Sequence, residues 1–189
     1  IGPAGVFPAQ EQEAFCRELL TGMGFSFVRG RADRSTHPFT TMIGEDDVRL
    51  TLRFQPDNPL SAIFAALHEG GHALYDQGFP ATLHDTLLAE APSTGLHESQ
   101  ARLWENHVGR SAAFWSHHLP RLQSRYPAAL AALDVAQFQR AVNVVQPTLI
   151  RAEADEVTYN LHILMRYELE TALLSGDLPV RDLPSAWNE

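Results

Sequence analysis

The chain has 189 residues, 44% of them hydrophobic, which is enough for one domain with a buried core. With 14 basic against 23 acidic residues, its formal net charge is −9, and this argues against nucleic acid and anionic membranes as partners, because both bind cationic surfaces. The only cysteine, Cys16, allows no disulfide within the chain and favours a cytoplasmic location. No apolar run reaches the roughly 18 residues that span a bilayer.

The hydrophobic pattern predicts a mainly α-helical chain with a small antiparallel sheet of two or three strands, an α+β fold. A first helix is expected over residues 8–22, followed by strands over 25–30 and 47–54. The second strand alternates apolar and polar residues, which predicts one buried face and one charged face. The most regular helical pattern covers residues 59–77. Further helices are expected over 95–109, 111–125, 134–145 and 153–174, with Pro120 bending or ending the helix over 111–125.

The helix over residues 59–77 contains the sequence His68-Glu69-Gly70-Gly71-His72, an H-E-x-x-H motif. Two histidines four residues apart lie on one helix face, so both imidazoles can reach one tetrahedral Zn²⁺. Glu69 then lies beside the metal, where its carboxylate can act as a general base. The motif arises by chance in roughly three of a hundred such sequences. The adjacent glycines argue against chance, because each costs a helix about 1 kcal/mol.

A catalytic zinc site needs a third protein ligand, and the sequence offers two neighbours, His97 and Glu98. Glu98 would supply a carboxylate from the start of the next helix, although such a residue also suits a helix N-terminus without any metal. His97 is the softer donor of the two. The spacing alone does not separate them.

Five segments resemble, in order and spacing, the signature blocks of the thermostable Taq-type metallocarboxypeptidases. They are HPFT (37–40), DVRLT (47–51), HEGGHALYDQG (68–78), GLHESQARLWENHVGRS (95–111) and IRAEADEVTYNLHI (150–163). The resemblance implies a helical, zincin-like enzyme that removes single residues from peptide C-termini. It implies His68, His72 and Glu98 as ligands of Zn²⁺ or Co²⁺, Glu69 as the catalytic base and His97 as a supporting residue beside the ligands.

Members of that family are far longer and are implied to form homodimers. We therefore interpret residues 1–189 as a single catalytic-core domain, a fragment of a longer chain. Its partners are expected to be peptides with a free C-terminus. Two other functions stay open: a zinc oligopeptidase or dipeptidyl carboxypeptidase with the same metal site, and a catalytically incomplete helical module that binds zinc.

A carboxypeptidase must also hold the terminal carboxylate of its substrate, which a two-donor arginine fork does best. Arg49 and Arg151 are the candidates, and the alternative for each is a surface ion pair of little energetic worth. Tyr159 and His162 follow a predicted core stripe of Val157, Leu161, Leu164, Met165 and Leu169, and either line the substrate cleft or satisfy hydrogen bonds within the packing. His37 is expected to hold substrate or a neighbouring loop.

Overall fold

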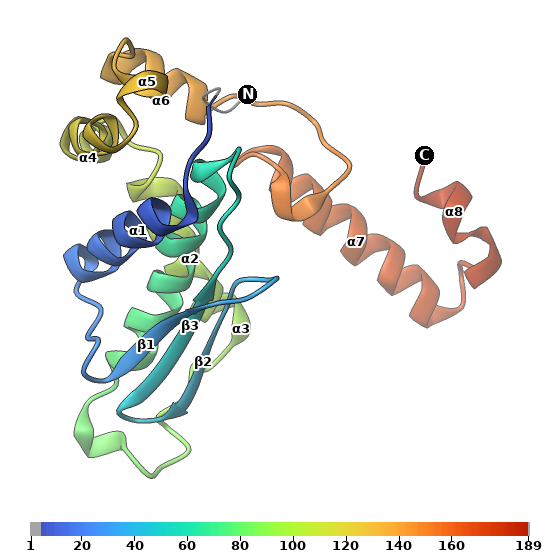
Figure 1. The fold of residues 1–189 in the computed structure, drawn as a ribbon. Helices are drawn as coiled ribbons and strands as arrows, with labels where there is room; N and C mark the ends of the chain where they lie inside the picture. The colour runs from blue at the N-terminus through green and yellow to red at the C-terminus, as the bar shows by residue number, and fades with distance from the viewer. Residues whose placement is uncertain (1–4, 189) are drawn as a thin grey trace. The chain divides into compact units, whose positions relative to one another are not determined.

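The computed structural model describes residues 5–188, without the side chain of Glu153, and divides the chain into two compact units, residues 1–142 and 143–189. The fold is mainly helical with one small sheet, as the hydrophobic pattern predicts (Figure 1). The first unit contains α1 (Ala9–Met23), β1 (Gly30–Arg34), β2 (Phe39–Gly44), β3 (Asp47–Leu52), α2 (Pro59–Gln77), η1 (Ala81–Leu83), α3 (Thr94–Arg102), η2 (Leu103–Val108), α4 (Ala112–Arg125), α5 (Pro127–Leu130) and α6 (Val135–Val142). The second contains η3 (Arg151–Glu153), α7 (Thr158–Ser175), η4 (Val180–Asp182) and α8 (Leu183–Ala186).

The sheet is mixed rather than antiparallel, which corrects the predicted topology. β2 and β3 form an antiparallel hairpin, but β1 pairs with β3 in parallel, so the order across the sheet is β1-β3-β2. The strand that follows β1 in sequence, β2, forms the opposite edge of the sheet, and β3 then lies between them. Strands adjacent in sequence are therefore not all adjacent in the sheet, and a pattern of alternating residues carries no information on that order.

The strand predicted over residues 25–30 is also wrong, because β1 begins only at Gly30. The hydrophobic residues that suggested it, Phe25 and Phe27, pack edge to face with ring centroids 4.9 Å apart. They belong to the hydrophobic cluster that joins α1, α2 and the sheet. Phe25 and Phe27 are therefore hydrophobic because they pack against the cluster from a turn, and not because they belong to a strand.

Helices α1 and α2 cover one face of the sheet (Figure 1). Val48, Leu50 and Leu52 of β3 point into this cluster against Ala62 and Ala66 of α2, as the alternation predicts. The opposite face is not wholly charged. There Thr51 is buried, because its hydroxyl pairs with that of Ser35 at 2.6 Å and the loop before β2 folds over it.

A second hydrophobic cluster joins α1, the first half of α2, α4 and α6 around Trp115 and Phe138, which are both almost completely buried. Pro120 lies inside α4 and does not end it.

The predicted helix over 95–109 is present in two parts, since the regular turns of α3 widen into a π-helical segment, η2. None of the helices between residues 5 and 188 is both long and apolar enough to cross a membrane.

In the second unit, α7 begins at Thr158 and carries apolar residues that remain exposed. Leu161 is 61% and Leu164 54% exposed, and Val157 before the helix is 55% exposed. The buried core stripe predicted along this helix is therefore wrong for these three positions. The helical period was correct, but periodicity does not show what lies against a face.

Candidate metal centre

Helix α2 carries the H-E-x-x-H motif and has the predicted boundaries. Pro59 occupies its first turn, where a missing N–H costs nothing, and the side chain of Asn58 accepts a hydrogen bond from the Ser61 N–H at 3.3 Å. Leu67 packs into the hydrophobic cluster around Trp115 and Phe138, whereas the next residue, His68, is only partly covered. The motif thus lies on a packed part of α2, with the two histidines on its partly open side.

His68, His72 and Glu98 converge, with their candidate ligand atoms within 4.8 Å of one another. Oε2 of Glu98 lies 3.3 Å from Nε2 of His72 and 3.7 Å from Nε2 of His68. Two ligands bound tetrahedrally to Zn²⁺ at about 2.0–2.1 Å are roughly 3.4 Å apart. The three side chains therefore fit a zinc ion with little rearrangement.

The close approach of two neighbouring helices, α1 and α3, explains the two glycines within the motif. A Cβ on Gly71 would lie 2.7 Å from Cα of Ala101 and 2.8 Å from the Gln100 carbonyl oxygen, both backbone atoms of α3. A Cβ on Gly70 would lie 2.7 Å from Cε of Met23 on α1. These glycines let two helices pack against the backbone of α2, and the contact at Gly71 brings Glu98 within reach of the histidines.

The environment of the candidate ligands favours a charged carboxylate next to the imidazoles. Burial opposes ionisation of Glu98, but hydrogen bonding to His72 and the charges of His68 and Arg102 outweigh it and lower its pKa to about 2. Burial likewise opposes protonation of His68, but the hydrogen bond with Glu105 and nearby carboxylates prevail, so the pKa of His68 is raised. A cation at this position would take over the attraction to Glu98 that the imidazoles now supply.

Glu69 is 6% exposed and lies on α2 between the two histidines. The hydroxyl of Thr40 on β2 lies 2.7 Å from Oε2 of Glu69 and 3.0 Å from its backbone carbonyl oxygen. Burial raises the pKa of the Glu69 carboxyl, and the Thr40 hydrogen bond reduces that effect. A carboxyl with a raised pKa is a better proton acceptor, which is the property of a general base.

Both histidines have partners at their other ring nitrogen. Nδ1 of His68 lies 2.9 Å from Oε2 of Glu105, a residue of η2, and the guanidinium of Arg102 donates to the same oxygen at 2.9 Å. Nδ1 of His72 lies 2.5 Å from Nδ1 of His97, whose Nε2 in turn lies 2.7 Å from Oδ1 of Asp76. Occupied Nδ1 atoms leave Nε2 of each ligand candidate to face the ion, as is usual for metal-binding histidines.

Sequence reasoning missed Thr40, Asp76, Arg102 and Glu105. Asp76 follows His72 by four residues and Glu105 follows Glu98 by seven, so helical spacing alone placed each on the correct face. Thr40 gave no such signal, because its contact depends on β2, a strand that was not predicted.

Two of the other predicted site residues, Arg49 and His37, lie in the first unit and have contacts close to them in sequence. Arg49 is two residues from Asp47 on β3 and forms a two-point ion pair with it, at 2.8 and 2.6 Å. Because Leu50 faces α2, strand alternation turns Arg49 to the opposite face of the sheet. The carbonyl oxygen of His37 accepts a hydrogen bond from the Ser35 hydroxyl, so at least its backbone holds the neighbouring loop.

Arg151, Tyr159 and His162 lie in the second unit. The Arg151 guanidinium donates to the Tyr159 hydroxyl, and Nε2 of His162 donates to the Thr148 carbonyl oxygen at 2.9 Å. These contacts are of the kind that satisfies polar groups within a segment, and the substrate-binding role of the three residues stays a prediction.

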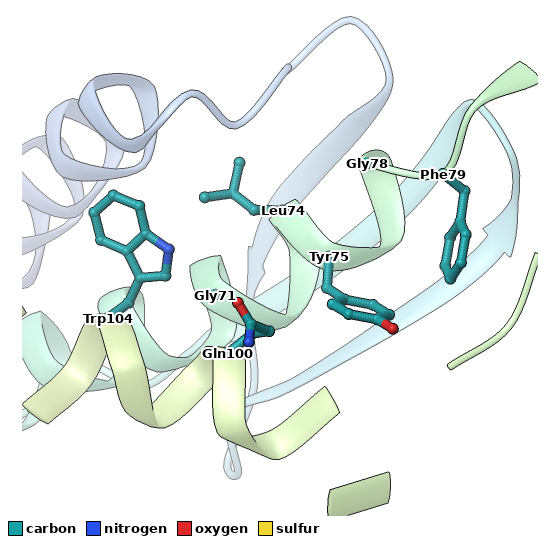
Figure 2. Close-up of a pocket in the computed structure, with 7 residues that line it drawn as sticks. All are labelled: Gly71, Leu74, Tyr75, Gly78, Phe79, Gln100 and Trp104. Carbon is teal, nitrogen blue, oxygen red and sulfur yellow. The ribbon is translucent and has the colours of Figure 1, made fainter. Parts of the chain in front are cut away.

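A cavity of about 430 Å³ lies along α2 and α3, lined by Gly71, Leu74, Tyr75, Gly78, Phe79, Gln100 and Trp104. Figure 2 shows Trp104 and Leu74 toward one end of it and Tyr75 and Phe79 toward the other. Its lining does not include His68, His72 or Glu98.

Two histidines and a glutamate on two crossing helices, with a glutamate between the histidines, define a metallopeptidase centre of the gluzincin type. Residues 3–189 match the family model described as carboxypeptidase Taq (M32) metallopeptidase, and the chain belongs to this family. It is 50% identical over 183 residues to thermostable carboxypeptidase 1 of Thermus thermophilus, across 97% of this chain and 36% of that protein. It is 40% identical to carboxypeptidase 1 of Bacillus subtilis, across 97% of this chain and 36% of that protein.

The fold agrees with solved structures of the family. The M32 carboxypeptidase of Deinococcus radiodurans R1 superposes with a TM-score of 0.94 and 45% identity, over 99% of this chain and 39% of that one. Metallocarboxypeptidase 1 of Trypanosoma cruzi gives a TM-score of 0.93 and 35% identity, over 100% and 37%. The chain therefore spans little more than a third of the length of these relatives.

Proposed function

We propose that this chain forms the zinc-binding and proton-transfer core of a carboxypeptidase that removes the C-terminal residue from peptides. The observation that carries the proposal is the convergence of His68, His72 and Glu98 around Nε2 and Oε2 atoms spaced for zinc, with Glu69 beside them. Membership of the M32 family supports the reaction class. Zn²⁺ fits the donor set, and Co²⁺ accepts the same ligands.

The bound ion would polarise the scissile carbonyl and acidify a water molecule. Glu69 would take the proton of that water and return it to the leaving amine, a transfer for which its buried position and raised pKa suit it. The Thr40 hydroxyl holds the Glu69 carboxyl in place from β2. We retain Arg49 and Arg151 as candidates for the substrate carboxylate, on their ability to donate two parallel hydrogen bonds.

The cytoplasmic location and a homodimer of the longer protein also belong to this proposal. The lone buried Cys16 supports the first, and the family resemblance supports the second. Cell fractionation and sedimentation of the full-length protein test them.

The test of the proposed function separates metal binding from turnover. The parent chain should bind about one zinc, Glu69→Gln should bind as much without hydrolysis, and His68→Ala or Glu98→Ala should lose the metal. Metal analysis and a peptide assay measure both. Turnover by Glu69→Gln would refute the role of the base, and zinc retained by Glu98→Ala but lost by His97→Ala would refute the ligand assignment.

The substrate class is tested with one peptide in two forms, a free acid and a C-terminal amide. A carboxypeptidase should cleave only the free acid, because it requires the terminal carboxylate. Cleavage of both forms would instead identify an oligopeptidase, and zinc binding without any cleavage would identify a catalytically incomplete module.

A further inference from the structure

We propose that Asp76, acting through the ring of His97, is a positioning residue that determines which nitrogen of His72 faces the metal. The inference rests on the proposed function, in which His72 is a ligand. It concerns a group one step removed from the ligand: Asp76 contacts Nε2 of His97, and Nδ1 of His97 contacts Nδ1 of His72.

The donors and acceptors along this chain of contacts follow from their chemistry. A carboxylate only accepts hydrogen bonds, so Nε2 of His97, 2.7 Å from Asp76, must carry a hydrogen. A neutral imidazole has one donor and one acceptor, which makes Nδ1 of His97 an acceptor. The hydrogen in the 2.5 Å contact with His72 then belongs to Nδ1 of His72. Nε2 of His72 is left with its lone pair, and this is the atom 3.3 Å from Glu98.

The packing holds the intermediate ring in the orientation that this requires. The His97 ring lies nearly parallel to that of His72, with centroids 4.6 Å apart, and the Tyr75 ring packs 5.0 Å from it. The side chains of Asp76 and His97 are only 11% and 21% exposed. Water therefore has limited access to the carboxylate and to the ring it orients.

The two candidate ligands thus have supports of different construction. His68 meets its carboxylate, Glu105, directly at 2.9 Å, whereas His72 reaches Asp76 only through a second imidazole. If Asp76 is removed, His97 can also adopt the tautomer with hydrogen on Nδ1. That tautomer donates to Nδ1 of His72 and moves the hydrogen of His72 to Nε2, where it competes with the metal.

The experiment is a double-mutant cycle on zinc affinity, measured by competition with a chelating dye. Asp76→Ala should weaken zinc binding about 10–100-fold, the usual range for a supporting residue. His97→Ala should have an effect of the same order, and the double variant should lose no more than His97→Ala alone, because Asp76 acts only through His97. The exposed Asp57 before α2 provides a matched control, and Asp57→Ala should stay within about twofold of the parent.

Thermal unfolding of each variant without metal separates positioning from a structural role. Positioning predicts that Asp76→Ala loses much more of the zinc-induced stabilisation than of the metal-free stability. Parental zinc affinity in Asp76→Ala, additive losses in the double variant, or a loss that appears equally in the metal-free chain would each overturn the inference alone. A parent chain that binds no zinc would overturn the proposed function as well.

Discussion

Helices α2 and α7 have similar compositions and different surroundings. Both are long helices that contain many apolar residues together with histidine and tyrosine. Their leucines differ in burial, since Leu67 of α2 is 0% exposed and Leu164 of α7 is 54% exposed. On α2, the polar partners of His68, Glu69 and His72 come from other elements, namely η2, β2 and α3. On α7 and the segment before it, Arg151, Asp155 and His162 contact residues of the same stretch of chain.

This difference between local and long-range hydrogen-bond partners explains why the polar side chains of α2 form a site. A residue whose partner lies nearby in sequence is held by its own segment, and its hydrogen bonds need no tertiary structure. The side chains on α2 are held by elements 25 to 37 residues away, so their arrangement exists only when the first unit is folded. Long-range support is therefore the property that distinguishes the candidate metal centre from the polar residues of α7.

The largest expected effect is on stability when the same truncation is made on each helix. Leu67→Ala should lower the free energy of unfolding by about 2–5 kcal/mol, because it opens a cavity in the core. Leu164→Ala should change it by less than about 0.5 kcal/mol, because the side chain is already exposed. Urea denaturation followed by circular dichroism measures both. Equal losses would show that α7 is buried in solution and would remove the contrast.

A smaller effect is expected at the crossing of α2 and α3. Gly71→Ala places a methyl group against the backbone of α3 and should cost about 1–3 kcal/mol of stability. It should also weaken zinc binding, because α3 carries Glu98. Gly22→Ala is the control, since a Cβ there meets nothing within 4 Å and should stabilise α1 by up to about 1 kcal/mol. Calorimetry with and without zinc measures both, and unchanged zinc affinity in Gly71→Ala would mean that the close approach is not needed.

The smallest expected effect is a pH dependence from His118, which lies outside the metal centre. Burial, together with the charges of His117 and Arg121, lowers the pKa of His118 to about 4. The unfolded chain takes up this proton first as the pH falls below about 6.5, so stability should decline between about pH 6.5 and 4 and be unaffected above that range.

Because His118 is only partly buried, solvent screening should keep this contribution below about 1 kcal/mol. His118→Gln should flatten the corresponding part of the stability curve of the metal-free chain, as measured by urea titrations at several pH values. A parallel curve for parent and variant would show that the ring titrates equally in both states.

The sequence predicts α2 to the residue, because a regular apolar period, Asn58 at its start and Gly78 after its end all agree. It also predicts that Val48, Leu50 and Leu52 share one buried face of β3, because apolar and polar residues alternate there. It does not predict the parallel pairing of β1, since strand order depends on contacts between segments. The apolar pattern in α7 is equally regular, but it predicts only that the segment is helical and not which element packs against it.

The candidate metal centre shows the same limit at the level of single residues. The pair His68 and His72 follows from local helix geometry alone. The choice between His97 and Glu98 does not, because it depends on how α3 is rotated against Gly71. In the structure Oε2 of Glu98 faces the histidine Nε2 atoms, and His97 contacts His72 through Nδ1 instead. The contact of Thr40 with Glu69 cannot be predicted locally either, because it depends on how β2 is aligned with β3 in the sheet.

The π-helical segment η2 has a consequence for how this region tolerates changes in length. Its N–H to C=O bonds skip one residue more than those of an α-helix, as in the 2.8 Å bond from Gly109 to Trp104. Deleting one residue between Trp104 and Val108 would let the segment close as ordinary α-helix. The axis would continue, and the residues on both sides of the deletion would keep nearly the same angular positions, because the widened turn holds one extra residue within about one turn of helix. A single-residue deletion here would thus remove the widened turn and still leave Arg110 on the side where it donates to the Val142 carbonyl oxygen.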